Sequence, residues 1–280
     1  MKTNYEVRQA SHPDDAKKYG TAQIREHYLI EKVIAPDEVN MVYSMIDRII
    51  AGGAMPVQEA LALEAVEIVK ADYFLTRREM GIINTGGPGV VTAGDQRYEV
   101  AFKEALYLGR GDRAITFASK DPGNPAKFYF NSAPAHRTCP DKLVTKKEAV
   151  VMEMGSLEGG NHRFINRMLV QEVVETCQLQ MGMTELQPGS VWNTMPVHTH
   201  DRRMEVYFYF ELPEEQAVCH FMGEPDETRH LWMHNQQAVI SPPWSIHAAC
   251  ATSSYTFIWG MCGENLDYSD QDFFQTKELK

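Results

Sequence analysis

Residues 197–209 read V-H-T-H-D-R-R-M-E-V-Y-F-Y and combine side chains typical of a metal site with those typical of a β-strand. In an extended strand, side chains two apart point to the same face, so His198 and His200 can reach one point above a sheet. Glu205 follows after four residues, which leaves room for a short turn before M-E-V-Y-F-Y continues as a strand. The stretch therefore predicts a β-sheet that carries two imidazoles and a carboxylate.

A fourth candidate ligand lies downstream in S-P-P-W-S-I-H-A-A-C, residues 241–250, where a Pro-Pro turn brings His247 to the start of a new strand. Three imidazoles and one carboxylate suit a borderline divalent metal, with zinc expected first and manganese, iron or nickel as alternatives. An H-x-H pattern alone is more often a surface or core pair, so the interpretation depends on the two later residues. The predicted metal ligands are His198, His200, Glu205 and His247.

The pattern H-x-H-x4-E with a later P-x-x-x-x-H resembles the two motifs of the cupin superfamily. It differs from the usual pattern in that Gly189 lies further upstream and Trp244 stands where the second motif has glycine. Longer stretches resemble the 5-keto-4-deoxyuronate isomerase family, and the resemblance runs nearly end to end. These stretches are W-N-T-M-P-V-H-T-H-D-R-R-M-E-V-Y-F-Y-F (192–210), R-H-L-W-M-H-N-Q-Q-A-V-I-S-P-P-W-S-I-H (229–247), M-V-Y-S-M-I-D-R-I-I-A-G-G (41–53) and Y-F-L-T-R-R-E-M-G-I-I-N-T-G-G (73–87).

This resemblance implies an all-β bicupin, with two related antiparallel β-barrels of the jelly-roll type and a few short helices. It implies a zinc-dependent aldose–ketose isomerase that converts 5-dehydro-4-deoxy-D-glucuronate to 3-deoxy-D-glycero-2,5-hexodiulosonate in the breakdown of pectin or other uronate polymers. One zinc ion per chain and a homohexamer are further implications. Two alternatives stay open: an iron-dependent cupin dioxygenase, because three His and one Glu also hold iron, and a non-catalytic sugar-binding cupin.

The spacing of turn signals independently favours a β sandwich or barrel. From Tyr73 onward, short β-type runs alternate with turns such as D-P-G-N-P at 121–125. We expect a short helix at residues 21–27 and a connector at about 133–165. Residues 58–70 have a helical composition but could equally form an alternating strand.

An internal repeat indicates how these strands are organised. Residues 105–115 align with residues 238–248, and the first copy has no metal ligand at the matching positions. The chain is therefore predicted to hold an N-terminal cupin-like domain, 1–140, with an arm and no metal site, and a C-terminal one, 141–280, with the metal and a tail. Chance similarity between short β segments is the alternative.

Charge and composition exclude several classes of partner. The net charge of −11 is concentrated in residues 141–280, which hold 10 basic and 20 acidic residues, so nucleic acid is not an expected partner. No apolar run approaches membrane-spanning length, and the first ten residues lack the apolar segment of a secretory signal. Five cysteines without C-x-x-C spacing suggest no disulfide framework, so a cytoplasmic location is expected.

Residues near the predicted metal are candidates for contact with an anionic small-molecule substrate. Strand alternation puts Arg203 and Tyr207 on the same side as Glu205. Arg203 could pair a substrate carboxylate in bidentate fashion or could be a surface ion-pair residue, and the Tyr207 hydroxyl could donate or relay a proton. The candidate catalytic residues are Tyr207 and Arg203, and the candidate substrate contacts are Arg163, Thr184, Thr194, Arg203 and Tyr207.

Overall fold

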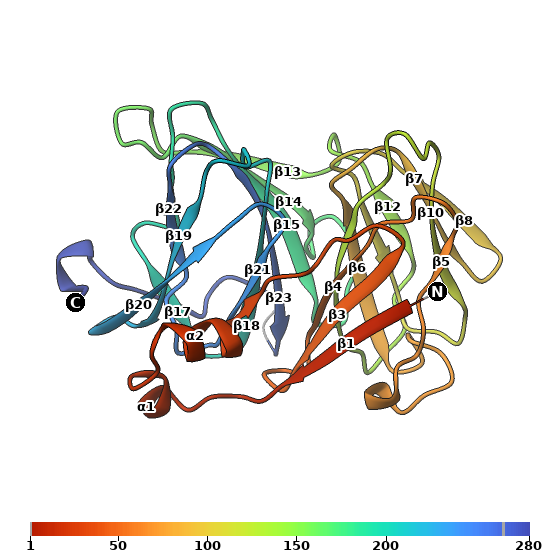
Figure 1. Cartoon of the computed structure of the whole chain (residues 1–280), viewed down its shortest axis with the longest axis horizontal. Helices are drawn as coiled ribbons and strands as arrows, with labels where there is room; N and C mark the ends of the chain where they lie inside the picture. Colours follow the sequence, from red (N-terminus) through yellow and green to blue (C-terminus); the bar gives the residue numbers. More distant parts are fainter. Residues whose placement is uncertain (1, 265–266) are drawn as a thin grey trace. The chain divides into compact units, whose positions relative to one another are not determined.

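The computed structural model describes residues 2–264 and 267–280, and strands are its main elements (Figure 1). The chain separates into two compact units, and each unit is made of segments that are not continuous in the sequence. The first unit holds the residues up to Arg8, Lys32–Val150 and Met168–Met181, and the second holds Gln9–Glu31, Val151–Arg167 and Gly182–Lys280.

The first unit contains a seven-stranded and a four-stranded sheet that face each other across a hydrophobic core. Phe117 on the smaller sheet stacks on Phe130 of the larger one, with ring centroids 6.1 Å apart. Strand β1 runs parallel to β3, whereas the other paired strands are antiparallel. The larger sheet has the order β1 (Lys2–Arg8), β3 (Glu38–Ser44), β4 (Ile50–Ala54), β11 (Phe128–Pro134), β6 (Arg78–Asn84), β9 (Ala105–Leu108) and β12 (Lys142–Val144); the smaller has β5 (Leu61–Ala62), β10 (Ile115–Ser119), β7 (Gly89–Ala93) and β8 (Gln96–Val100).

The second unit repeats this plan and adds a two-stranded ribbon, β17 (His198–His200) with β24 (Gln271–Phe273). Across its core, the Tyr209 hydroxyl lies 2.8 Å from Nδ1 of His220 on the opposite sheet. Its larger sheet has the order β13 (Val150–Met154), β14 (Arg163–Leu169), β15 (Gln180–Leu186), β23 (Thr256–Gly263), β18 (Arg203–Phe210), β21 (Ala238–Ser241) and β2 (Leu29–Ile30); the smaller has β16 (Trp192–Asn193), β22 (Ala248–Ala251), β19 (Val218–Glu224) and β20 (Glu227–Met233).

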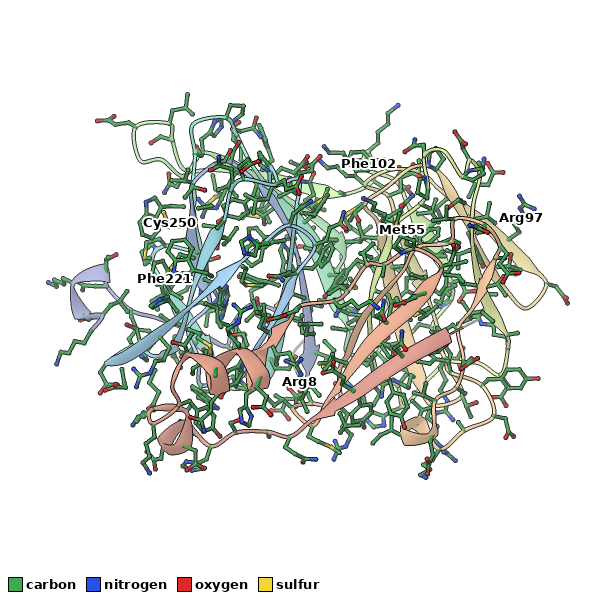
Figure 2. All side chains as sticks on the ribbon, viewed as in Figure 1. Arg8, Met55, Arg97, Phe102, Phe221 and Cys250 are labelled. Carbon is green, nitrogen blue, oxygen red and sulfur yellow. The ribbon has the colours of Figure 1, made fainter. Side chains whose placement is uncertain are left out.

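The all-β class is confirmed, but the expected pair of closed barrels is not. In the described part of the chain, hydrogen bonding closes none of the sheets, because edge strands such as β13 and β20 have a neighbour on one side only. Figure 2 shows side chains filling the space between the two sheets of each unit. Each unit is therefore a pair of open sheets with a packed interior.

Helical segments are few and short. The helix expected at residues 21–27 is confirmed as α2 (Thr21–Tyr28), and a single turn, α1 (Pro13–Ala16), precedes it. Residues 58–70 contain both a short strand, β5, and a 3₁₀ turn, η1 (Glu67–Val69). A second 3₁₀ turn, η2 (Thr276–Glu278), lies near the C-terminus. None of the described helices is long and apolar enough to cross a membrane.

The region expected as a connector, about residues 133–165, is where the chain passes from the first unit to the second, between Val150 and Val151, but it also contains strands. This region contains β12, β13 and the beginning of β14, so it contributes strands to both units. All five residues of β13 are exposed, and its sequence V-V-M-E-M shows no regular alternation of polar and apolar side chains. The period-two pattern that marks a half-buried strand is consequently weak there.

Candidate metal centre

Three segments of the second unit bring the four predicted ligands together. His198 and His200 lie on β17, Glu205 lies on β18, and His247 immediately precedes β22. All four side chains are buried, and their ligand atoms lie within 4.8 Å of one another. The group can therefore offer three nitrogens and a carboxylate to a single ion.

The turn that carries His247 is held against strand β19. Ser245 Oγ accepts a hydrogen bond from Gly223 N at 2.9 Å, and Ile246 N donates to Gly223 O at 2.9 Å. Within the turn, Ser245 N donates to Pro242 O at 3.0 Å. The Pro-Pro sequence thus forms a defined turn whose last residue, His247, is buried inside the sheet pair.

The separations between ligand atoms fit a divalent metal. His198 Nε2 lies 3.0 Å from His247 Nε2, and His200 Nε2 lies 3.0 Å from Glu205 Oε1. Glu205 Oε2 lies 3.6 Å from His247 Nε2. Two ligands of a tetrahedral zinc ion, each about 2.05 Å from the metal, would be about 3.3 Å apart. Each histidine therefore turns its Nε2 atom toward a common centre at metal-like spacing.

Burial sets the protonation states that a metal requires. It lowers the pKa of His198 to about 2 and that of His247 to about 4, so both imidazoles are neutral and keep a lone pair. Burial raises the pKa of Glu205, but its contacts with His247 and His200 outweigh burial, and the net pKa is lowered. Neutral imidazole and ionised carboxylate are the forms that bind metal ions.

A cavity of about 460 Å³ opens beside this group. Much of its wall is apolar, and side chains such as Met152, Phe257 and Trp259 contribute to it. Gly182 permits this wall, because a Cβ atom at that position would lie 2.1 Å from the Trp259 ring. The polar lining comes from two ligands, two arginines and several hydrogen-bonding residues: His198, Glu205, Arg163, Arg167, Thr184, Thr194, Tyr207, Tyr268 and Gln271.

Tyr207 and Thr194 face each other at this cavity. Thr194 Oγ1 lies 3.3 Å from the Tyr207 hydroxyl. Burial, reinforced by the charge of Glu205, raises the pKa of Tyr207 well above its usual value, so the phenol keeps its proton. Thr194 has a φ of 50°, a left-handed conformation that costs a non-glycine residue about 1–3 kcal/mol. The surrounding structure therefore holds Thr194 against a local strain at the edge of the site.

The structure places Arg203 in an environment different from the one expected. Strand alternation does put it on the Glu205 side of β18, but the C-terminal tail covers it. Arg203 Nη1 donates to Asp267 O at 2.7 Å, Nη2 lies 3.1 Å from Asp270 Oδ1, and Nε donates to His200 Nδ1 at 3.3 Å. Its side chain is almost fully buried and does not line the cavity. Arg163, Thr184, Thr194 and Tyr207 do line it.

Three polar residues of the cavity lining were missed by sequence reasoning: Arg167, Tyr268 and Gln271. Arg167 shares a face of β14 with Arg163, because residues four apart on a strand point the same way, so alternation alone could have identified it. Tyr268 and Gln271 belong to the tail, and no local pattern marks them. Gln271 Nε2 lies 3.2 Å from His198 Nε2, a contact across 73 residues of sequence.

We predict that the purified protein binds one metal ion per chain. Among the described residues, His198, His200, Glu205 and His247 form the one group of at least three ligand side chains that could hold an ion. Elemental analysis after extensive dialysis should give about one equivalent. A value near two would contradict the prediction and would require a further site, with His136 or His162 as the residues to examine.

Several solved structures have a similar fold. An IolB-like protein from Salmonella typhimurium LT2 aligns with a TM-score of 0.67 at 15% identity, covering 81% of this chain and 87% of that one. Oxalate decarboxylase from Lactobacillus farciminis aligns with a TM-score of 0.56 at 10% identity, covering 81% and 79%. At these identities the likeness concerns the fold alone.

Sequence relatives are far more similar. The 4-deoxy-L-threo-5-hexosulose-uronate ketol-isomerase 1 of Bacteroides thetaiotaomicron is 70% identical over 280 residues and covers both chains completely. A protein of Formosa agariphila with the same enzyme name, without the numeral, is 56% identical, again over the full length of both. The KduI/IolB family model matches residues 28–280. With this coverage and this identity, the chain belongs to the KduI/IolB family.

Proposed function

We propose that this protein is a metal-dependent ketol-isomerase that converts 5-dehydro-4-deoxy-D-glucuronate to 3-deoxy-D-glycero-2,5-hexodiulosonate. The observation that carries the proposal is that a buried three-histidine, one-glutamate group shares a cavity with two arginines and a protonated tyrosine. Full-length relatives with 56–70% identity bear the name of this activity. The cavity volume of about 460 Å³ suits a six-carbon sugar acid.

His198, His200, Glu205 and His247 would hold the metal. A divalent ion bound there would act as a Lewis acid, polarising the substrate carbonyl and stabilising negative charge that develops on the substrate oxygens. The protein supplies the ligand atoms in buried, pre-oriented positions. The apolar side chains of the wall, such as Met152 and Trp259, reduce the amount of water in the cavity. Electrostatic interactions with a bound sugar are stronger in such an environment.

Tyr207 is proposed as the catalytic proton donor. An aldose–ketose isomerisation moves a proton between adjacent carbons and a second proton between their oxygens. The Tyr207 hydroxyl lines the cavity together with Glu205, and its raised pKa keeps the proton on the oxygen. Thr194, at 3.3 Å, can orient that hydroxyl toward a sugar oxygen.

The substrate carboxylate is assigned to Arg163 and Arg167. Residues 141–280 carry a net charge of −10, from 10 basic and 20 acidic residues, so the long-range field of this half repels an anion. The cavity itself offers positive charge to an anion, because two arginines of strand β14 line it. Arg163 is half-buried, and burial lowers its pKa, yet a guanidinium stays charged at neutral pH. A partly desolvated arginine–carboxylate pair is a strong short-range contact that can overcome the field.

We predict that Arg163→Met and Arg167→Met each lower kcat/KM on the uronate by about 100-fold, the scale of a charged contact worth about 3 kcal/mol. Metal content should be unchanged in both variants, because neither side chain belongs to the ligand group. Lysine at either position should restore part of the loss, since it keeps the charge without the planar fork.

Arg97→Met is the matched control for these two variants. Arg97 is exposed on β8 of the first unit, where it is labelled in Figure 2. Its replacement should leave kcat/KM unchanged. Normal activity in both cavity variants would mean that other residues hold the carboxylate.

The decisive test of the proposed activity is an assay on unsaturated-uronate breakdown products, with the product identified by NMR and the bound metal by elemental analysis. Isomerisation without consumption of dioxygen supports the proposal. Dioxygen consumption would instead identify an iron-dependent dioxygenase, and tight sugar binding without turnover would identify a binding protein. The metal-free protein should regain activity on addition of a divalent ion.

Finer features of the proposal rest on the family resemblance. They are zinc as the resident metal, a homohexameric assembly, a cytoplasmic location and a role in the breakdown of pectin or related polymers. The two-cupin organisation, with domains 1–140 and 141–280, belongs to the same proposal. Elemental analysis tests the metal, and light scattering tests the assembly.

A further inference from the structure

The C-terminal segment, residues 267–280, passes directly beside the metal ligands. Its strand β24 pairs antiparallel with β17, which opposes Phe273 to His198 and Gln271 to His200. The pairing extends beyond the ribbon, since Phe274 N donates to Val197 O at 3.0 Å. The tail is dark blue in Figure 1 and ends in the 3₁₀ turn η2. Two of the ligands are therefore carried by a strand whose hydrogen-bonded neighbour is the tail.

We propose that Asp270, in the turn before β24, is a positioning residue that orients His200 as a metal ligand, which makes the C-terminal tail part of the metal centre. Asp270 is buried, and its Oδ2 lies 3.4 Å from His200 Nδ1. Its other oxygen, Oδ1, lies 3.1 Å from Arg203 Nη2. One carboxylate thus contacts both the imidazole and the guanidinium that lies beside it.

This contact selects the form of the imidazole that binds metal. His200 directs Nε2 toward Glu205 at the common centre, so Nε2 must present a lone pair and Nδ1 must carry the hydrogen. A carboxylate near Nδ1 is an acceptor for that hydrogen in the metal-bound form, and such a contact fixes both the tautomer and the ring orientation. Asp270 Oδ2, at 3.4 Å, is the carboxylate oxygen in this position. Arg203 alone would favour the opposite tautomer, because its Nε donates toward Nδ1 at 3.3 Å. Asp270 Oδ2 supplies the acceptor that the Nδ1–H form needs, and Asp270 Oδ1 pairs with the buried guanidinium.

Arg203 is held in place by the same tail. Its guanidinium lies over the Tyr268 ring, 5.0 Å from the centroid, and it donates to Asp267 O at 2.7 Å. These contacts hold the guanidinium between the tail and His200, outside the lining of the cavity. The tail, the arginine and His200 form one connected group.

The test measures metal affinity directly, with Co²⁺ as the probe. Metal-free wild-type protein is titrated with Co²⁺, and binding is followed by the visible absorption of the bound ion, whose intensity and wavelength report ligand geometry. Asp270→Asn should raise the Co²⁺ dissociation constant by about 10–100-fold and alter the spectrum. This is the usual loss of affinity when a residue that hydrogen-bonds to a metal ligand is replaced. Asp272→Asn is the matched control: it changes the same charge at an exposed position on β24 and should leave both readings unchanged.

A double variant separates positioning from folding. Asp270→Asn leaves the Arg203 guanidinium buried without its counter-charge, which can destabilise the protein by itself. Arg203→Met with Asp270→Leu replaces the whole buried pair by apolar side chains of similar volume, a change that is often neutral for stability. The metal-free double variant should unfold at nearly the wild-type temperature and still bind Co²⁺ about 10–100-fold more weakly.

Wild-type Co²⁺ affinity and spectrum in either variant would overturn the assignment of Asp270 as a positioning residue. The inference rests on the metal centre in the proposed function, and the two can fail separately. A wild-type protein that binds no Co²⁺ would reject the metal centre itself. Normal wild-type binding with unaffected variants would reject the role of Asp270 alone.

Discussion

Alanine in place of His247 is expected to remove the bound metal and to lower kcat/KM by on the order of 1000-fold or more. The reason is that the ion stabilises developing charge in the transition state by several kcal/mol, and each 1.36 kcal/mol corresponds to a factor of about ten in rate. His247 Nε2 lies 3.0 Å from His198 Nε2 and 3.6 Å from Glu205 Oε2, at the centre of the ligand group. Its loss leaves three ligands and an unfilled space in a buried site. Elemental analysis and steady-state kinetics on the same preparation measure both effects.

The same result is expected for alanine at each of the other three ligands, His198, His200 and Glu205. His234→Ala is the matched control, because His234 is exposed in the turn before β21 and should tolerate the change. Full metal occupancy and full activity in the His247→Ala protein would show that the Pro-Pro turn does not carry a ligand. Loss of activity with retained metal would instead assign His247 to the chemistry rather than to the ion.

The second large effect concerns stability and centres on Glu79, a fully buried carboxylate on β6 of the first unit. Its oxygens accept four hydrogen bonds: from Cys177 N and Gln178 N at 2.7 Å, from Leu179 N at 2.8 Å and from the Tyr107 hydroxyl at 2.6 Å. Glu79→Ala should lower the free energy of unfolding by roughly 3–5 kcal/mol. Each buried amide that loses its acceptor costs about 1–3 kcal/mol, and removing a buried carboxylate offsets part of this loss. Urea denaturation followed by far-UV circular dichroism measures the change.

Two further variants give this prediction its controls. Glu79→Gln keeps one acceptor oxygen, so its loss should be intermediate. Glu99→Ala removes an exposed carboxylate that pairs with Lys120, and an exposed ion pair contributes about 1 kcal/mol or less. If Glu79→Ala were as stable as Glu99→Ala, the chain at residues 177–179 would not depend on the buried carboxylate.

The clustering of His198, His200, Glu205 and His247 could be predicted from the sequence because its geometry is mostly local. His198 and His200 share a face of one short strand, and Glu205 follows after a single turn, so strand alternation suffices to bring three ligands together. His247 was recognisable because a Pro-Pro turn restricts where the next strand begins. The all-β class followed in the same way from short β-type runs between turn signals.

The region at 133–165 shows where this reasoning stops. Strand β13 is paired on one side and exposed throughout, so its residues show no alternation of polar and apolar side chains. Without that pattern, the turn-rich sequence on either side of the strand indicates a connector. Sheet pairing depends on the partner strand as well as on the strand itself, and the partner is not visible in a local window.

The surroundings of the arginines were decided by the tertiary structure alone. Alternation on β18 gave Arg203 the correct side, but whether it meets a substrate or a carboxylate of the protein depends on Asp270, which lies 67 residues away in the chain and is brought to it by the tail. Gln271 reaches His198 in the same way, across 73 residues. Local patterns determine which face of a strand a side chain occupies, because the backbone repeats every two residues. The residues that pack against that face come from segments far away in the sequence. No periodic pattern in the sequence indicates which segments these are.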